Sequence, residues 1–172
     1  MKNLQFMTMI FCLFFAGQVV AQDTTKRYTK VPVGYLMVLR QGDDVLAHIE
    51  SLAVKEKIPS ANFSGMGFVN ARFGFFNFST KEYEPKEFNN VELASMQGSI
   101  AWQDGKVSLH THGVVTDKDF KAYGGHLLKA VVGTGSVEIL VTVHDKKLER
   151  VLEQPLGANV LHIAPSYRPG NK

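Results

Sequence analysis

Residues 92–115 read ELASMQGSIAWQDGKVSLHTHGVV, and this stretch sets the class of the fold. Two runs rich in apolar residues, 92–102 and 106–115, flank the pair Asp104-Gly105. An Asp-Gly pair between two such runs is a strong signal for a tight hairpin turn. The stretch therefore predicts two neighbouring antiparallel strands, around which the rest of the chain has to pack.

Upstream of this hairpin, the sequence predicts a strand followed by a helix. Residues 34–40 are bulky and apolar, as in a buried strand, and Asp43 or Asp44 can cap a helix that ends before Pro59. The apolar residues that recur within it at helical spacing are Val45, Ile49, Leu52 and Ala53. The chain shows no repeat and no linker, so we expect one domain of mixed α and β structure.

Further strands are predicted on both sides of these elements. Residues 81–90 resemble a turn with a short edge strand, and residues 146–152 indicate no clear type. The remaining strand-like runs are 61–69, 71–78, 127–132, 137–143 and 160–163, with Gly133-Thr134-Gly135 separating the third from the fourth.

The first 21 residues have the pattern of a secretory signal peptide. Lys2 precedes an apolar run over residues 6–15, and Ala21 is a small residue at the expected cleavage point. The run is shorter than the roughly 20 apolar residues that a membrane-spanning helix needs. We therefore expect no stable membrane span after cleavage, with an uncleaved anchor as the alternative. Either way the domain is expected outside the cytoplasm, periplasmic or secreted.

The cysteine and charge content indicate how the mature domain is stabilised and which partners it can bind. The one cysteine, Cys12, lies in the predicted signal, so the mature domain must rely on its core, on subunit contacts or on a metal instead of disulfides. The formal net charge is +3, and the basic residues are scattered along the chain. A protein that binds the phosphate backbone carries a clustered basic stripe, so we expect no nucleic-acid partner.

Three histidines have the spacing of a metal site. His110 and His112 are two apart on a predicted strand, so their side chains project from the same face. His126 is the expected third ligand, because Gly124-Gly125 lets its backbone approach a neighbouring strand closely. Three histidines without a cysteine would leave one coordination position open for water or substrate. The alternative is that they are ordinary polar or hydrogen-bonded residues of the sheet.

The order of several short motifs resembles that of a known family. It is the PPC domain (plants and prokaryotes conserved domain), long a domain of unknown function, in its stand-alone prokaryotic form. The similarity runs from about Gly34 to Ile163. The motifs are Arg40 with Gly42-Asp43-Asp44, Ser64-Gly65-Met66-Gly67, Glu92-Leu93-Ala94-Ser95, Gly98-Ser99-Ile100, His110 with His112, the Asp117 region, Gly124-Gly125-His126-Leu127 and Val137-Glu138.

This resemblance implies an α+β fold with a mainly antiparallel β-sheet flanked by helices, in a single domain that usually assembles as a homotrimer. It also implies a bound metal, most often zinc, which some prokaryotic members hold by residues that match His110, His112 and His126. The fold is more distantly similar to that of acetolactate decarboxylase, whose metal is likewise held by three histidines, although a shared fold does not fix function. Plant members carry a basic AT-hook that reads DNA, and this chain has none. We therefore expect that the description of family members as DNA-binding proteins does not apply to this chain.

Two charged residues are candidates for supporting roles. Arg40 ends a buried strand and could hold a substrate carboxylate through its planar guanidinium, or make an ordinary salt bridge or subunit contact. Glu138 lies in an otherwise apolar strand. A carboxylate there would have to be paired, contact a metal-ligating histidine, or act in acid–base chemistry.

Two functions stay open on these observations, and the sequence does not decide whether the protein is an enzyme. The first is an exported metal-dependent hydrolase or lyase for a small carbonyl or carboxylate compound, with Glu138 as acid–base and Arg40 as anion clamp. The second is a non-catalytic trimeric module that binds a small ligand or a protein, with a structural metal. The expected layout is a signal peptide at 1–21, a flexible leader at 22–33, a PPC-like domain at 34–165 and a tail at 166–172.

Overall fold

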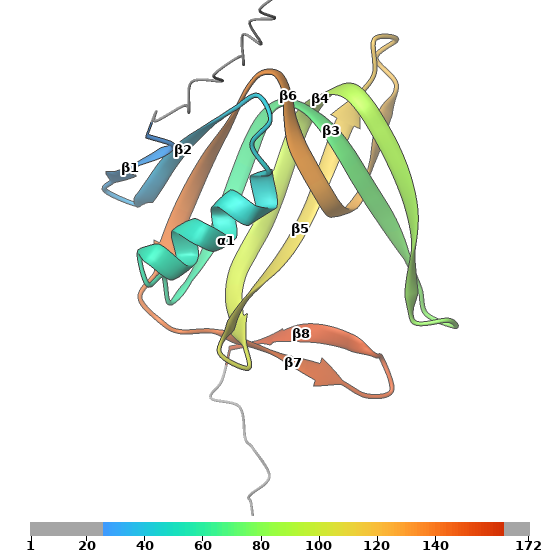
Figure 1. The fold of residues 1–172 in the computed structure, drawn as a ribbon. Helices are drawn as coiled ribbons and strands as arrows, with labels where there is room; N and C mark the ends of the chain where they lie inside the picture. The colour runs from blue at the N-terminus through green and yellow to red at the C-terminus, as the bar shows by residue number, and fades with distance from the viewer. Residues whose placement is uncertain (1–25, 164–172) are drawn as a thin grey trace, which may run out of the picture.

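The computed structural model describes residues 26–163 of the 172-residue chain, which form a single, mainly β domain (Figure 1). The predicted signal peptide, 1–21, and the predicted tail, 166–172, lie outside the described residues. The elements in chain order are β1 (Tyr28–Val31), β2 (Gly34–Arg40), α1 (Val45–Lys55), β3 (Ser60–Asn77), β4 (Glu82–Gln103), β5 (Lys106–Thr116), β6 (Ala122–His144), β7 (Glu149–Glu153) and β8 (Ala158–His162).

Strand β1 lies within the segment 22–33 that the sequence assigns to a flexible leader. Residues 28–31 pair antiparallel with β2. The ring of Tyr28 packs edge-on against Tyr35 with 5.9 Å between ring centroids, and its hydroxyl donates to Glu56 at 2.6 Å. One aromatic residue in a polar segment thus anchors this part of the expected leader to the domain.

Helix α1 has the predicted cap and the predicted buried face. The side chain of Asp44 accepts a hydrogen bond from the backbone nitrogen of Ala47 at 3.0 Å, as an N-cap residue does. Lys55 lies in the last turn, where a cation interacts favourably with the helix dipole. The four buried residues are Val45, Ile49, Leu52 and Ala53, as expected from their spacing.

Strands β3 and β6 are each longer than the sequence predicts. The runs 61–69 and 71–78, apart from residue 78, belong to the single strand β3, and the runs 127–132 and 137–143 belong to β6. The expectation of four shorter strands was therefore wrong. Breaks in the register of β3 with β4, between Gly65 and Gly67 and again before Ala71, bend the strand without ending it.

These long strands close on themselves. β3 and β5 each pair with both β4 and β6, so the four strands form a hydrogen-bonded ring. β1 and β2 extend the sheet from the outer edge of β6. The core fills the ring and the space beneath α1, and its largest fully buried side chains include Leu39, Ile49, Leu93, Leu127 and Ile139.

The expectation of a sheet flanked by helices is corrected to one helix within residues 26–163. Because the ring buries its own interior, α1 has only one sheet face left to cover (Figure 1). On the opposite face Leu36, Met66 and Leu140 are 39%, 59% and 39% exposed. No helix in the described part of the chain is long and apolar enough to cross a membrane.

The last two strands form a hairpin that stands apart from the main sheet. β7 pairs antiparallel with β8, and the segment 146–152, which the sequence left unassigned, leads into it. Its backbone is joined to the sheet by a parallel bridge between Trp102 and Glu149, with a hydrogen bond from the backbone nitrogen of Trp102 to Leu148 O at 3.0 Å. The hairpin therefore lies across the lower end of β4 and β5 in Figure 1.

Candidate metal centre

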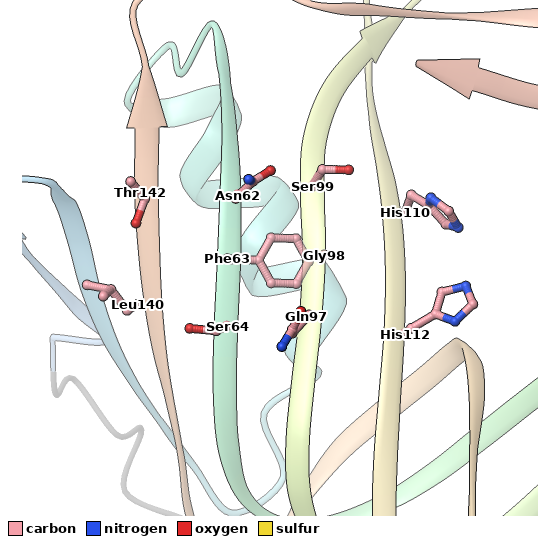
Figure 2. Close-up of a pocket in the computed structure, with 10 residues that line it drawn as sticks. All are labelled: Asn62, Phe63, Ser64, Gln97, Gly98, Ser99, His110, His112, Leu140 and Thr142. Carbon is pink, nitrogen blue, oxygen red and sulfur yellow. The ribbon is translucent and has the colours of Figure 1, made fainter.

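His110 and His112 are carried by β5, the second strand of the predicted hairpin. Its turn residues Asp104 and Gly105 have positive φ angles of 50° and 78°, as a tight hairpin turn requires. The two imidazoles project to the same side of β5, and their ring centroids are 5.1 Å apart (Figure 2). Strand alternation sends Thr111, between them, to the buried face.

Strand β6 brings His126 directly opposite His112, since the two residues are partners in the β5–β6 ladder. Gly124 makes this approach possible, because a Cβ atom at this position would lie 2.6 Å from the carbonyl oxygen of Gly113. Any larger residue at Gly124 would push β6 away from β5. The close approach predicted for the glycine pair before His126 is therefore present at Gly124.

The three imidazoles form one compact cluster. One ring nitrogen from each of His110, His112 and His126 lies within 4.8 Å of those of the other two. Ligand nitrogens around a tetrahedral zinc ion, with bonds of about 2.0–2.1 Å, lie roughly 3.4 Å apart. Small side-chain rotations would therefore bring these nitrogens to coordination distance, and the three histidines could hold a metal ion.

The surroundings of His110 and His126 favour the neutral form of the imidazole, which is the form that binds a metal. Burial, together with the neighbouring histidines and the cation of Arg150, lowers the pKa of His126 to about 4. Burial first, and then Arg150 and His112, also lower the pKa of His110. Both rings are therefore neutral at pH 7, and metal ions bind the neutral imidazole.

Two further residues at the cluster were missed from the sequence. Tyr83 of β4 stacks on His126 with 4.7 Å between ring centroids, which fixes the plane of that imidazole. Arg150 of β7 is 5% exposed and donates from Nη2 to the hydroxyl of Ser99 at 2.6 Å. Burial lowers the pKa of its guanidinium. Neither residue has a local signal, since one lies in a charged edge segment and the other in a segment of unclear type.

Two hollows meet at the histidines. A cavity of about 630 Å³ lies between the main sheet and the β7–β8 hairpin, and its lining includes His110, His126 and Arg150. A second hollow of about 440 Å³, shown in Figure 2, extends from His110 and His112 across β4 and β3. A ligand at the cluster would therefore have room on both sides.

Glu138 and Arg40 do not reach this cluster within one chain. Glu138 lies opposite Met66 in the β3–β6 ladder, and β3 and β4 separate it from β5. Three strand spacings of about 4.8 Å put it roughly 14 Å from the histidines. Arg40 is exposed on β2, one strand farther out, opposite Ser136. The acid–base and anion-clamp roles expected for these residues therefore lack the required position.

Residues 27–145 match the family described as the Plants and Prokaryotes Conserved (PCC) domain. The chain belongs to this family. The match confirms the resemblance to the PPC domain that the sequence motifs indicate. The three histidines lie inside the matched segment, whereas Arg150 and the β7–β8 hairpin of this PPC protein lie beyond its end. No curated protein matches the chain.

Three similar solved structures come from different organisms. A candidate DNA-binding protein from Ralstonia eutropha JMP134 is 54% identical, with a TM-score of 0.79, over 80% of this chain and 96% of that chain. A second candidate DNA-binding protein, from Bacteroides thetaiotaomicron VPI-5482, is 27% identical, with a TM-score of 0.74, over 78% and 95%. A metal-containing protein from Archaeoglobus fulgidus is 30% identical, with a TM-score of 0.67, over 79% and 98%.

These relatives correct one expectation about partners. Two of them are candidate DNA-binding proteins, so the exclusion of nucleic acid on the basis of scattered charge is not upheld. The charge argument was weak for a physical reason. Phosphate contacts come from side chains and backbone N–H groups that folding brings together, and these groups need not be neighbours in the sequence.

Proposed function

We propose that this PPC-domain protein binds a divalent transition metal, zinc in the first instance, on His110, His112 and His126. The observation that carries the proposal is the convergence of three imidazole nitrogens within 4.8 Å at the meeting point of two hollows. The metal-containing relative from Archaeoglobus fulgidus supports it. Three protein ligands leave a coordination position open, as in catalytic zinc sites.

We further propose that the centre acts on a small carbonyl or carboxylate compound as a hydrolase or lyase. A zinc ion supplies Lewis-acid polarisation of a carbonyl and lowers the pKa of bound water. The chain itself supplies three imidazole ligands, a stacked Tyr83 that holds the His126 ring in place, and a cavity of about 630 Å³. That volume is typical of small-molecule sites.

A non-catalytic binding module is the second candidate, and one observation favours it. Among the described residues, none of those lining the cavity beneath the hairpin is an Asp or Glu. The phenol of Tyr83 and the hydroxyl of Ser108 are the ionisable or hydroxyl groups there besides the histidines and Arg150. A screen of small esters, lactones and 2-oxo acids with the metal-loaded protein separates the two candidates, since only the enzyme turns a compound over.

Metal analysis of the purified protein, prepared without a His-tag, tests the metal site directly. We expect about one zinc or similar ion per chain, and loss of that ion in His110→Ala/His112→Ala. His48→Ala is the matched control, because His48 lies on α1 and contacts the backbone oxygen of Asp44. If the unsubstituted protein takes up no metal even after incubation with zinc, the proposal fails.

Export and trimer formation complete the proposal. The basic start, the apolar run and Ala21 support a cleaved signal peptide and a periplasmic or secreted protein. Comparison of the N-terminal sequence of the exported protein with residue 22 tests this. The PPC resemblance supports a homotrimer, and the uncovered sheet face around Leu140 offers apolar surface for subunit contact.

Nucleic acid is a further candidate partner, because two relatives are candidate DNA-binding proteins. Fluorescence anisotropy with a random-sequence duplex at 50 and 200 mM salt tests it. Affinity that falls steeply with salt indicates phosphate contacts. Unchanged anisotropy at micromolar protein would remove DNA as a partner under these conditions.

A further inference from the structure

Arg150 is a buried cation without a matching anion. Its side chain is 5% exposed, Nη2 donates to the hydroxyl of Ser99, and Nε has no hydrogen-bond partner. Among residues 26–163, no ion pair joins it to an Asp or Glu. Burying a charge with an unsatisfied donor is costly unless a partner compensates. The environment of Arg150 is therefore incomplete in the isolated chain.

The position of Arg150 indicates where the missing anion would lie. Arg150, His110 and His126 line the same cavity, so an anion held by the guanidinium would lie near the histidines. The other polar groups in that lining are neutral, among them Ser108 and Asn159. An anion in this cavity would thus have one cation available besides any metal on the histidines.

The hairpin that carries Arg150 is held in place from several sides. The side chain of Gln103 donates to Asn159 at 3.0 Å, and Lys81 Nζ donates to the carbonyl oxygens of Pro155 and Leu156 at 3.1 and 2.9 Å. These contacts fix the hairpin over the histidines, so the guanidinium is positioned before any ligand arrives. A preorganised site loses less free energy on binding than a flexible one.

We propose that Arg150 binds the carboxylate of a small organic acid in this cavity, next to the metal centre. A guanidinium presents parallel N–H donors that match the two oxygens of a carboxylate. If the histidines hold a metal, a second oxygen of the same ligand, such as a carbonyl oxygen, could bind it. The contact of this second oxygen rests on the proposed function, because it requires a metal on the histidines. The contact between Arg150 and the carboxylate requires no metal.

The test is a calorimetric titration of the purified, zinc-loaded protein with pyruvate and with its neutral isostere pyruvamide. We expect pyruvate to bind roughly 10- to 100-fold more tightly than pyruvamide, as a charge-assisted hydrogen bond would give. Arg150→Met should abolish this preference while zinc content stays unchanged. Arg150→Lys, which keeps the charge but not the planar fork, should retain part of it. Arg40→Met is the matched control, because Arg40 is exposed on β2.

Stability gives a second readout that a purely structural arginine would not produce. Replacing an unpaired buried cation with an apolar side chain of similar length should leave the melting temperature unchanged or raise it. Loss of folding or of assembly in Arg150→Met would instead mean that a subunit carboxylate pairs with the guanidinium, which overturns the proposal. Equal binding of pyruvate and pyruvamide, or binding of neither, overturns it too.

The two proposals fail in different ways. If the protein takes up no zinc, the metal proposal falls, and the same titrations on the metal-free protein still test Arg150 alone. If zinc binds to the histidines but the arginine variants titrate like the unsubstituted protein, the metal proposal stands and the carboxylate site is wrong.

Discussion

Asp43 shows how one carboxylate organises the junction between β2 and α1. It accepts a hydrogen bond from Arg27 Nε at 2.5 Å and another from the backbone nitrogen of Arg40 at 2.8 Å. Burial alone would raise the pKa of Asp43, but the two hydrogen bonds and the charges of Arg27 and His48 more than offset this. The pKa therefore lies below its ordinary value, which means that folding favours the ionised form.

Asp43→Asn should destabilise the protein near neutral pH and much less in acid. Because the folded-state pKa is lowered, the carboxylate stabilises the fold fully above the unfolded pKa of about 3.9, and this contribution is lost as pH falls through the folded pKa. We expect a loss of about 1–2 kcal/mol at pH 7 and a clearly smaller loss near pH 2. Urea unfolding at both pH values measures it.

Asp119→Asn is the matched control for this experiment, because Asp119 pairs only with the exposed Lys118 on a loop. Its effect should stay within about 0.5 kcal/mol at either pH. An Asp43→Asn variant whose loss is as large at pH 2 as at pH 7 would show that geometry, not charge, is what the residue contributes.

At the scale of elements, the sequence predicted the helix and the β4–β5 hairpin, because both depend on residues that are neighbours in the chain. The helix follows from the cap at Asp44 and its apolar spacing, and the β4–β5 hairpin follows from Asp104-Gly105. The full length of strands β3 and β6 does not follow from such local signals. Glycines such as Gly133 resemble strand ends in a sequence, but here β6 continues through them. Its pairing with β3 is interrupted after Val132 and resumes at Val137, as at a bulge.

The residues of the candidate site also differ in whether a local sequence pattern reveals them. The pair His110 and His112 is visible in the sequence because strand alternation is local, and His126 was found from the glycines before it. Arg150 was not found, since its burial depends on where a distant hairpin folds over the sheet. Glu138 attracted attention as a charge in an apolar strand, yet that strand presents it to the exposed face.

The β7–β8 hairpin is joined to the sheet mainly by side-chain contacts and by only one ladder bridge among the described residues, so it should open more readily than the ring. Lys81→Met removes the two hydrogen bonds from Nζ to Pro155 and Leu156 at the hairpin tip. Exposed hydrogen bonds of this kind contribute about 1 kcal/mol. We expect amide hydrogen exchange within 149–162 to rise roughly fivefold, while exchange in α1 stays the same. Mass spectrometry of peptides from the two regions measures this.

Lys118→Met serves as the comparison, since Lys118 is exposed and bonds only its neighbour Asp119. Exchange in the hairpin should not respond to it. If Lys81→Met leaves exchange within 149–162 unchanged, the hairpin is held by its other contacts, such as the bond from Gln103 to Asn159.

At the scale of the whole molecule, the two faces of the extended sheet differ in what covers them. α1 packs on one face (Figure 1), whereas the other carries Leu36 and Leu140 side by side as partners in the β2–β6 ladder. Met66 extends this apolar surface, and the three side chains line one shallow hollow of about 310 Å³. A contiguous apolar patch on a domain surface is typical of an interface.

This face provides the test of the proposed homotrimer. Met66→Glu/Leu140→Glu should convert the trimer to a monomer, because each charge would have to be buried without a partner in the contact. Val54→Glu is the matched control, since Val54 is 60% exposed on α1 and the same change there leaves the sheet face intact. Light scattering after size exclusion at about 10 μM distinguishes the states, because a stable interface buries roughly 800 Å² per partner and should persist on dilution. If the double variant stays trimeric, the subunits contact one another through a different surface. An unsubstituted protein that is monomeric would remove the trimer itself, and a carboxylate of a neighbouring subunit could then no longer be the partner of Arg150.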